Sequence, residues 1–469
     1  MPAVMAQEKS RRSGCILMFV ILVISVLLVA GSLFAIRWRG RGLVRDEIAR
    51  IRSENLPATT AEGDSYYSIP EGRDDITEIW VQAVGTHSTG PFNNSIIQLN
   101  QYEAEGLPYV GSDAASIVVL PGEDWPALPA AKAYLAHYED GLLKVHLAAR
   151  QTGSVRYPVR LASGFAALLP HTQALRTPSR MLRLQALVRA HEGDAHGAFD
   201  SLMAILKAAQ SLENEPLLIS SLVHAAIVSN GLQSIRELTP CVAFTDEELQ
   251  RFQTEIRRIR SPKLLHRALA MERAMGNDVF QNPGQMGHIG VDPSLAHLSL
   301  LSGPGDQLAY LDLMRRFIDA AKLDLPQSLD AALDVENDLK KVAGGKFLRL
   351  QRPLTTMFVP AVMASFNADA RTHADCRITD VFIAVERFRR NHDRQPPPSL
   401  EALVPDFLPE LPIDPFDGLP LRFRLDSTDV VIYSIGSDRK DNGGQVENDP
   451  TKEIVARFPL EPTRLANPQ

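Results

Sequence analysis

The chain has 469 residues with 49 basic and 56 acidic side chains, which give a formal net charge of −7 at pH 7. This acidic balance lacks the basic surface that nucleic-acid binding requires, so we expect no nucleic-acid partner. The three cysteines, Cys15, Cys241 and Cys376, are too far apart for a disulfide framework or for the usual spacing of a zinc site. A chain of this length exceeds one ordinary hydrophobic core, and several packed units are expected.

An uncharged apolar run occupies residues 15–36. As a helix that rises about 1.5 Å per residue, it is long enough to cross the roughly 30 Å hydrocarbon core of a bilayer. It is longer than the apolar part of a signal peptide and continues directly into Arg37 rather than into a small-residue cleavage site. We therefore predict a short tail at 1–14 and an uncleaved transmembrane helix at 15–36, with the lipid bilayer as its partner.

The charges on either side of this run do not settle its orientation. Three basic residues precede the run and four follow it closely, so the positive-inside rule is nearly balanced. Trp38, just behind the run, suits the headgroup layer, where amphipathic rings are enriched. The flanking residues thus support a membrane span but leave open the side on which the bulk of the chain lies.

Residues 37–160 are rich in Gly, Pro, Ser and Asn, and we predict a mixed α/β juxtamembrane region. The segments 95–99 and 115–120 favour strands because they combine β-branched and apolar residues. The stretch 126–150, rich in Ala, Leu and Lys, favours a helix. Trp80 and Trp125 lie in this region and are expected to fill its core.

From 161 to 350 the pattern becomes helical, because apolar residues recur three and four positions apart. We predict an antiparallel helical array, and hence a mainly α protein. Thr245 and Glu248 have the spacing of a capping box at a helix start, and Pro216 is expected in the first turn of another helix. The array is predicted to be interrupted by a Gly- and Pro-rich break at 276–306 and to resume at about 307–341.

The C-terminal segment, 351–469, combines helical and strand patterns. Residues 354–366 are apolar but too short to cross a bilayer, so we expect a buried helix there. An apolar stripe at 378–388 predicts a helix that ends before the prolines at 396–398. Alternating or apolar runs then predict a small sheet, with strands at 421–425, 430–435 and 454–458.

The order of motifs in this segment resembles that of a known family. A helix is followed by the proline run, Leu-Glu-Ala-Leu-Val at 400–404, Leu-Pro-Ile-Asp-Pro-Phe at 411–416, Tyr-Ser-Ile-Gly at 433–436 and Gly-Gly at 443–444. This arrangement is similar to the globular domain of the major pseudopilins of type II secretion systems, over about residues 370–450. The resemblance implies a small α+β module, a bacterial cell and an extracytoplasmic location.

Pseudopilins of this kind bind calcium in the loop that matches 436–449. The resemblance therefore implies calcium as a cofactor and gives four candidate ligands with the oxygen atoms that this ion prefers: Asp438, Asp441, Asn442 and Asp449. The match is incomplete, since Arg439 stands where a glycine is expected. The N-terminal run also lacks the processing site and the glutamate of a pseudopilin, so filament assembly is not implied.

Motifs that would indicate catalysis are weak in this sequence. His191 and His196 flank a Gly-Asp turn and lack the i, i+4 spacing that holds zinc on one helix face. No GxSxG, P-loop or dinucleotide-binding motif occurs. We therefore expect a non-catalytic structural or interaction protein in the cytoplasmic membrane of a bacterial envelope, with protein partners there and a link to a secretion or pseudopilus-like system. A ligand-binding or sensory ectodomain and an envelope enzyme with an unrecognised site are the alternatives.

Overall fold

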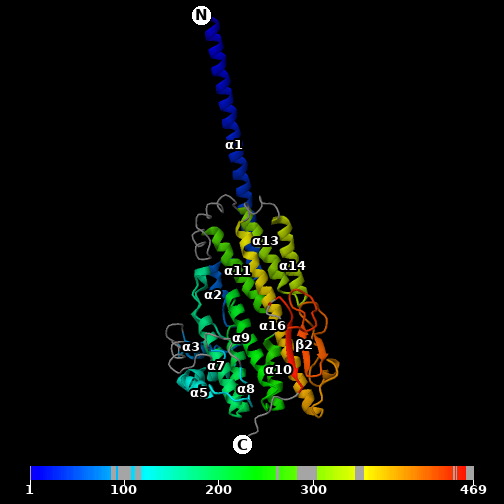
Figure 1. Cartoon of the computed structure of the whole chain (residues 1–469). Helices are drawn as coiled ribbons and strands as arrows, with labels where there is room; N and C mark the ends of the chain where they lie inside the picture. Colours follow the sequence, from blue (N-terminus) through cyan, green and yellow to red (C-terminus); the bar gives the residue numbers. More distant parts are fainter. Residues whose placement is uncertain are drawn as a thin grey trace.

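The computed structural model describes the following residues: 2–85, 91–92, 107–110, 118–259, 263–282, 304–343, 353–446, 449 and 451–460. They form a mainly helical protein with one small sheet, which confirms the predicted fold class at that level. In Figure 1 a single long helix leaves an elongated body whose long helices run side by side, and the sheet lies along one flank of this body.

The helix that leaves the body is α1 (Pro2–Ser53), which contains the whole predicted span at 15–36. It continues well beyond residue 37, where the sequence predicted a mixed region. Its last turns are held in the body, because Val44 and Ile51 are buried in a core that they share with α13. The helix extends to Ser53 because its last turns have an apolar face that packs against α13.

Between α1 and the array, the described residues form helices and coil without an extended strand. The helices are η1 (Thr60–Glu62), α2 (Gly63–Tyr66), α3 (Thr77–Val84), α5 (Leu128–His137), α6 (Glu139–Ala149) and η2 (Leu161–Ala166). The helix predicted at 126–150 is thus confirmed, as two helices. The mixed α/β prediction is wrong for the described part, since 118–120 is coil, and the predicted strand at 95–99 lies outside the described residues.

The reason for this difference is packing. Trp80 and Trp125 are 2% and 7% exposed, as the sequence analysis expected, and they belong to the same hydrophobic core as the helical array. The helices α3 and α6 pack on each other and on α7 and α8. Side-chain burial against helices outweighs a local preference for strand, which depends strongly on context.

The array itself consists of α7 (Pro170–His191), α8 (Ala195–Gln210), α9 (Leu218–Leu238), α10 (Asp246–Ile259) and α11 (Lys263–Gln281). The predicted capping box is confirmed, since Thr245 N donates to Glu248 at 2.8 Å and Glu248 N donates to Thr245 Oγ1 at 3.2 Å. Pro216 precedes the start of α9 at Leu218, so its predicted place in a first turn is wrong by two residues.

The central helix of the array, α9, is apolar and long. Among the described residues it meets the length and composition expected of a membrane span, with a mean hydropathy of 1.3 in its most apolar window. That window is 56% buried, and α9 packs against α7, α8, α11 and α16. Its apolar character is explained by its place inside the body (Figure 1).

The predicted break at 276–306 begins later than expected, because α11 continues to Gln281. Residues 283–303 of it lie outside the described residues, and the next described helix, α13 (Pro304–Ala320), begins at Pro304. A second helix, α14 (Gln327–Ala343), follows, so the helical pattern predicted at about 307–341 is confirmed, as two helices. Both pack against α16 (Pro353–Asn391).

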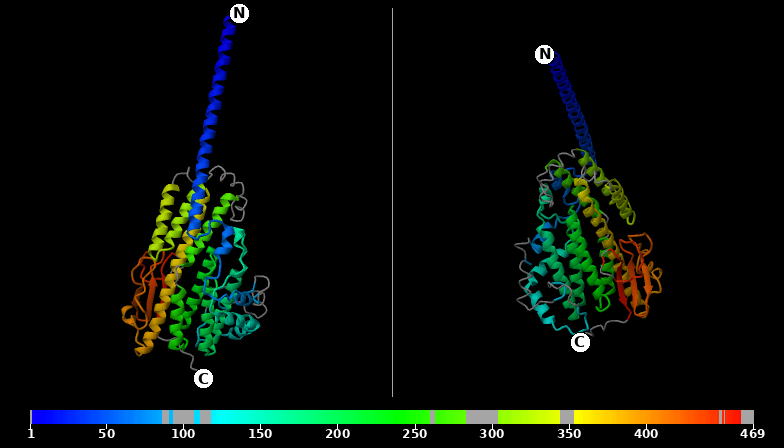
Figure 2. Two further views of the ribbon diagram at one scale, coloured as in Figure 1. Left: turned by 180° about the vertical axis from the view of Figure 1, so that it is seen from behind. Right: turned by 45° about the horizontal axis from the view of Figure 1, so that its top comes forward.

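The long helix α16 joins the array to the sheet. Its first half packs on α9, α13 and α14, and its second half covers the sheet. The sheet has the antiparallel order β1 (Arg422–Leu425), β2 (Asp429–Ser434) and β3 (Ile454–Pro459), within one or two residues of the predicted strands. Phe382 of α16 packs against Phe458 of β3, with tilted rings whose centres are 4.8 Å apart. Figure 2 shows from two further sides that α16 runs the length of the body.

Candidate functional site

The first candidate site is the loop in which the sequence predicts calcium ligands. Asp438 accepts a hydrogen bond from the backbone N–H of Lys440 at 3.1 Å and lies 3.2 Å from the ammonium group of Lys452. These contacts, the Lys440 amide foremost, lower the pKa of Asp438. Asp449 accepts hydrogen bonds from the amide and the hydroxyl of Thr451, both at 2.8 Å. Both carboxylates therefore already have protein donors.

The other two predicted ligands are adjacent to each other. Asp441 accepts hydrogen bonds from the Tyr433 hydroxyl and from Gly443 N, each at 3.0 Å, and its second oxygen lies 3.6 Å from Arg422 Nε. The side-chain nitrogen of Asn442 is buried without a hydrogen-bond partner. Arginine thus supplies the positive charge nearest to Asp441.

Glu453, which the sequence analysis did not single out, organises this loop. It is 6% exposed, and its carboxylate accepts hydrogen bonds from the backbone N–H groups of Asn442 (2.5 Å), Gly444 (3.0 Å) and Gln445 (3.0 Å). A carboxylate that accepts several backbone N–H bonds can fix a loop, because these bonds are charge-assisted. Its position one residue before the alternating pattern of β3 was the one available signal.

Within the residues that the structure describes, no group of three or more His, Cys, Asp and Glu side chains lies close enough to hold a metal ion. Asp438, Asp441 and Asp449 are all described and are not gathered round one point. Calcium binding therefore stays a prediction, and a chelator tests it. If calcium binds in this loop, a chelator should lower the melting temperature of the protein. An unchanged melting temperature would show that the loop does not bind calcium.

A buried carboxylate joins two of the motifs on which the pseudopilin resemblance depends. Asp414, from the Leu-Pro-Ile-Asp-Pro-Phe motif, is 0% exposed. It accepts hydrogen bonds from Phe416 N at 3.0 Å, Ser434 Oγ at 2.8 Å and Ile435 N at 2.9 Å, and the last two residues belong to the Tyr-Ser-Ile-Gly motif. Burial raises the pKa of Asp414, and the backbone hydrogen bonds oppose that shift. The two motifs are therefore parts of one structural contact.

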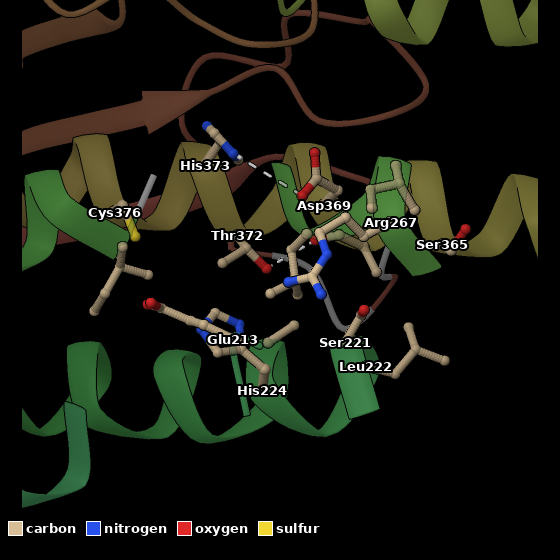
Figure 3. A pocket seen from close by; sticks show the side chains of 15 residues that line it. Glu213, Ser221, Leu222, His224, Arg267, Ser365, Asp369, Thr372, His373 and Cys376 are labelled. Carbon is tan, nitrogen blue, oxygen red and sulfur yellow. Dashed lines mark hydrogen bonds and ion pairs between the residues drawn. The ribbon is translucent and has the colours of Figure 1, made fainter. Parts of the chain in front are cut away.

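The second candidate site is a cavity of about 180 Å³ between α9 and α16, closed by the turn after α8 and the start of α11. Figure 3 shows the side chains that line it. Its walls are mainly apolar, and its polar lining residues are Glu213, Ser221, His224, Arg267, Ser365, Asp369, Thr372, His373 and Cys376. A mostly apolar cavity with a few convergent polar groups is the usual form of a small-molecule site.

His224 reaches from α9 into this cavity (Figure 3). Its residue exposure is 6%, and its Nε2 atom is buried without a hydrogen-bond partner. Burial lowers the pKa of His224 to about 4, so the imidazole is neutral at pH 7. A neutral imidazole offers one donor and one acceptor nitrogen, and Nε2 has no hydrogen-bond partner within the described part of the protein.

Asp369 and His373 lie one turn apart on α16, with Oδ1 and Nε2 at 3.9 Å. Burial raises the pKa of Asp369 to about 7, although the side chain is 29% exposed. That surface borders two hollows, because both residues also line a second cavity of about 280 Å³ beside the turn between α13 and α14. Asp369 is thus a carboxyl that can change charge near neutral pH at the boundary of two cavities.

Glu213 is the other acid of the first cavity and follows α8. Burial raises its pKa to about 7, opposed by Arg258, whose nearest nitrogen is 3.9 Å away. Glu213 also lines a third hollow of about 130 Å³ next to Trp80. The three hollows therefore follow one another through the body, with Glu213 at one junction and the Asp369–His373 pair at the other.

Arg267 supplies the guanidinium group that lines the first cavity, and this group is engaged by other residues of the protein. It donates a hydrogen bond to Asn214 Oδ1 at 3.0 Å and lies over the ring of Tyr66, 5.6 Å from its centre. Its charge is thus partly used within the protein. Two titratable carboxyls and one neutral imidazole are therefore among the polar groups that a bound molecule meets.

Sequence reasoning missed this cavity because its polar residues come from helices far apart in the chain. His224 and Asp369 stand on otherwise apolar helix faces, which is a weak signal without the fold. The histidines that the sequence did single out lie elsewhere: His191 contacts the Val119 carbonyl oxygen at 2.9 Å, and His196 contacts Glu248 at 2.8 Å.

Comparison of the chain with protein-family models, with curated proteins and with solved structures finds no match. The resemblance to pseudopilins therefore rests on the order of motifs in the sequence, and the functional argument rests on the site geometry.

Proposed function

We propose that this chain is a single-pass, membrane-anchored, non-catalytic interaction protein of a bacterial envelope. Residues 15–36 cross the cytoplasmic membrane, and the body lies on the extracytoplasmic side, where its pseudopilin-like end links it to a secretion or pseudopilus-like system. The helical array serves as the scaffold that carries this end.

The observation that carries the proposal is the exposed apolar surface of α1. Leu27, Leu28, Phe34 and Trp38 are 65%, 67%, 73% and 69% exposed. In every view of Figures 1 and 2 this part of α1 stands clear of the body. Apolar surface in water is unfavourable by about 25 cal/mol per Å², so exposed apolar side chains along one helix support a membrane span.

The proposed role of the C-terminal end is supported by the way in which it is attached. Because α16 is one continuous helix, its second half cannot move under the sheet without moving its first half among α9, α13 and α14. Arg439 of the loop also forms an ion pair with Asp330 of α14. A rigidly mounted module at the side of the body suits a protein that presents a surface to partners.

Membrane insertion is tested by replacing Leu27 and Leu28 together with arginine in the full chain. Each arginine near the centre of a span is unfavourable by about 2.5–3.5 kcal/mol, so the double variant is expected to leave the membrane fraction on an alkaline wash. The control is Leu143→Arg on α6, an exposed leucine of the body (56%), and this variant should stay in the membrane. Release of the control, or retention of the double variant, would contradict the anchor.

Orientation is tested separately with a C-terminal reporter that is active only outside the cytoplasm. The proposal predicts an active fusion, and a silent but well expressed fusion would place the body in the cytoplasm. Partners are tested by purification from membranes in mild detergent. Recovery of envelope proteins with the wild-type chain is expected, and their loss with a chain that ends at residue 391 would assign the contact to the sheet module.

A ligand-binding or sensory ectodomain is the second candidate function, and the cavity at His224 favours it. The Nε2 atom of His224 is a buried nitrogen without a protein partner, in a cavity that two acids also line, and such a set of polar groups suits a binding site. The same acids bear on the third candidate, an envelope enzyme, because a carboxyl with a pKa of about 7 can act as a general acid. Either role begins with the binding of a small molecule.

A further inference from the structure

We propose that the cavity between α9 and α16 binds a small organic cation, a primary amine with a short alkyl body, whose ammonium group is held by Asp369 and whose N–H also meets His224. This inference deepens the second candidate function and rests on it. It does not depend on the membrane anchor.

The geometric basis is the buried, unpartnered nitrogen of His224, a residue whose side chain lines the cavity. The residue is 6% exposed, its Nε2 has no hydrogen-bond partner, and it lines the cavity (Figure 3). Leaving a buried polar atom unpartnered is unfavourable, so a molecule with a hydrogen-bonding group is expected there. A ligand N–H satisfies Nε2 when the ring proton is on Nδ1.

The charge of the cavity selects a cation. Glu213 and Asp369 both line it, and the one guanidinium group, Arg267, is engaged by Asn214 and Tyr66. An anion would meet these two acids, whereas an ammonium group gains a charge-assisted hydrogen bond from an ionised carboxylate. The carboxyl pair therefore disfavours phosphates and carboxylates as occupants.

The walls and the size select an organic cation over a metal ion. The walls include Leu222, Ala225, Ile259, Leu264 and Leu265, which suit methylene groups. A cavity of about 180 Å³ accommodates an alkyl chain of a few carbons. No group of three or more potential ligands is gathered within the described part of the chain, as a metal ion would need. Because an acid lines the cavity at each junction, we expect a diamine, with one ammonium group for each acid, to bind more tightly than a monoamine.

Binding is expected to depend on pH, since the acids must lose their protons to hold an ammonium group. Asp369 is faced by His373 of its own helix, by Arg267 of α11 and, across the second cavity, by Arg257, Asp324, Arg377 and Glu410. Glu213 is faced by Lys207, Glu255, Arg258 and Arg73. With a pKa of about 7, each carboxyl is roughly one-tenth ionised at pH 6 and nine-tenths at pH 8.

The test is a calorimetric titration of the full chain in detergent with 1-butylamine, 1,4-diaminobutane and the neutral isostere 1-butanol, at pH 6 and pH 8. We expect the amines to bind, the diamine more tightly, and 1-butanol not to bind. Affinity should rise about tenfold from pH 6 to pH 8. Asp369→Asn should weaken amine binding at least tenfold, while the control Asp334→Asn, an exposed acid of α14, should leave it unchanged.

His224→Phe provides a second variant that fills the cavity with a ring of similar shape and should also abolish binding. Three outcomes overturn the inference. If 1-butanol and 1-butylamine bind equally well and Asp369→Asn changes neither affinity, the cavity binds a ligand but does not select a cation. Equal loss in Asp334→Asn would reduce the effect to general surface charge. The absence of binding by all three compounds would leave only water in the cavity and remove the ligand-binding function as well.

Discussion

Two acids, Asp414 and Asp369, show how differently the sheet module and the helical array use polar groups. Asp414 of the module accepts hydrogen bonds from Phe416, Ser434 and Ile435, all from the protein. Asp369 of the array has His373 at 3.9 Å, beyond hydrogen-bond distance, and borders two cavities. Burial raises the pKa of both groups. The first carboxyl holds a fold together, and the second faces space that a ligand can occupy.

This contrast separates structural from functional acids without any reference to relatives. A polar group whose hydrogen bonds are all satisfied internally stabilises one conformation. A polar group that is buried but left facing a cavity lowers stability in the free protein, and natural proteins tolerate such a group mainly at sites of function. The following predictions test the contrast, from the largest expected effect to the smallest.

Removal of the satisfied acid should have the largest effect. In Asp414→Ala, Phe416 N, Ile435 N and Ser434 Oγ lose their acceptor in a fully buried position, so we expect a loss of about 3–5 kcal/mol in the free energy of unfolding. Urea unfolding of the full chain measures it. The control Asp406→Ala, an exposed acid of the same module, should change stability by less than about 0.5 kcal/mol. Equal effects in the two variants would contradict the structural role of Asp414.

The neutral histidine should make the protein sensitive to acid. The pKa of His224 is about 4 in the folded chain and about 6.5 when unfolded, so the unfolded state binds the extra proton as pH falls from 6.5 to 4. His224→Leu should therefore gain about 3 kcal/mol relative to wild type between pH 7 and pH 4. Thermal unfolding at a series of pH values measures this difference. The exposed His196, whose pKa is raised by Glu248, should show a smaller effect of opposite sign in His196→Leu.

Asp369 should act in the other direction from His224. Its folded pKa of about 7 lies above that of an unfolded aspartate, so its contribution is fully present below about pH 4 and is lost as pH rises to 7. Asp369→Asn should therefore become more stable relative to wild type as pH rises from 4 to 8, by about 1–2 kcal/mol once solvent screening at the partly exposed side chain is allowed for. A constant difference across this range would mean that Asp369 is ionised throughout.

The smallest effect is expected at the loop of the module. Glu453→Gln keeps one carbonyl oxygen for the amides of Asn442, Gly444 and Gln445 but removes the charge, so we expect a loss of about 1 kcal/mol. Melting curves of wild type and variant, each with calcium and with chelator, measure it. A loss that appears only with calcium would show that the ion, rather than Glu453, organises the loop.

The sequence was informative where structure depends on neighbours in the chain. The capping box at Thr245 and the three strands of the module were predicted from local patterns, and each is present. The cavity was not predicted, because His224 and Asp369 are brought together by the packing of α9 on α16, which no local pattern encodes. Likewise, the role of Asp414 became visible only when strand pairing placed Ser434 beside it.

The contrast between the two acids is tested most directly by crystal structures of the full chain grown with and without 1-butylamine. The account predicts a ligand nitrogen within about 2.7–3.2 Å of an Asp369 carboxylate oxygen, with the alkyl chain against the leucines of α9 and α11 and with the contacts of Asp414 unchanged. A cavity that holds only water in the presence of the amine, with His224 Nε2 bonded to that water, would contradict it.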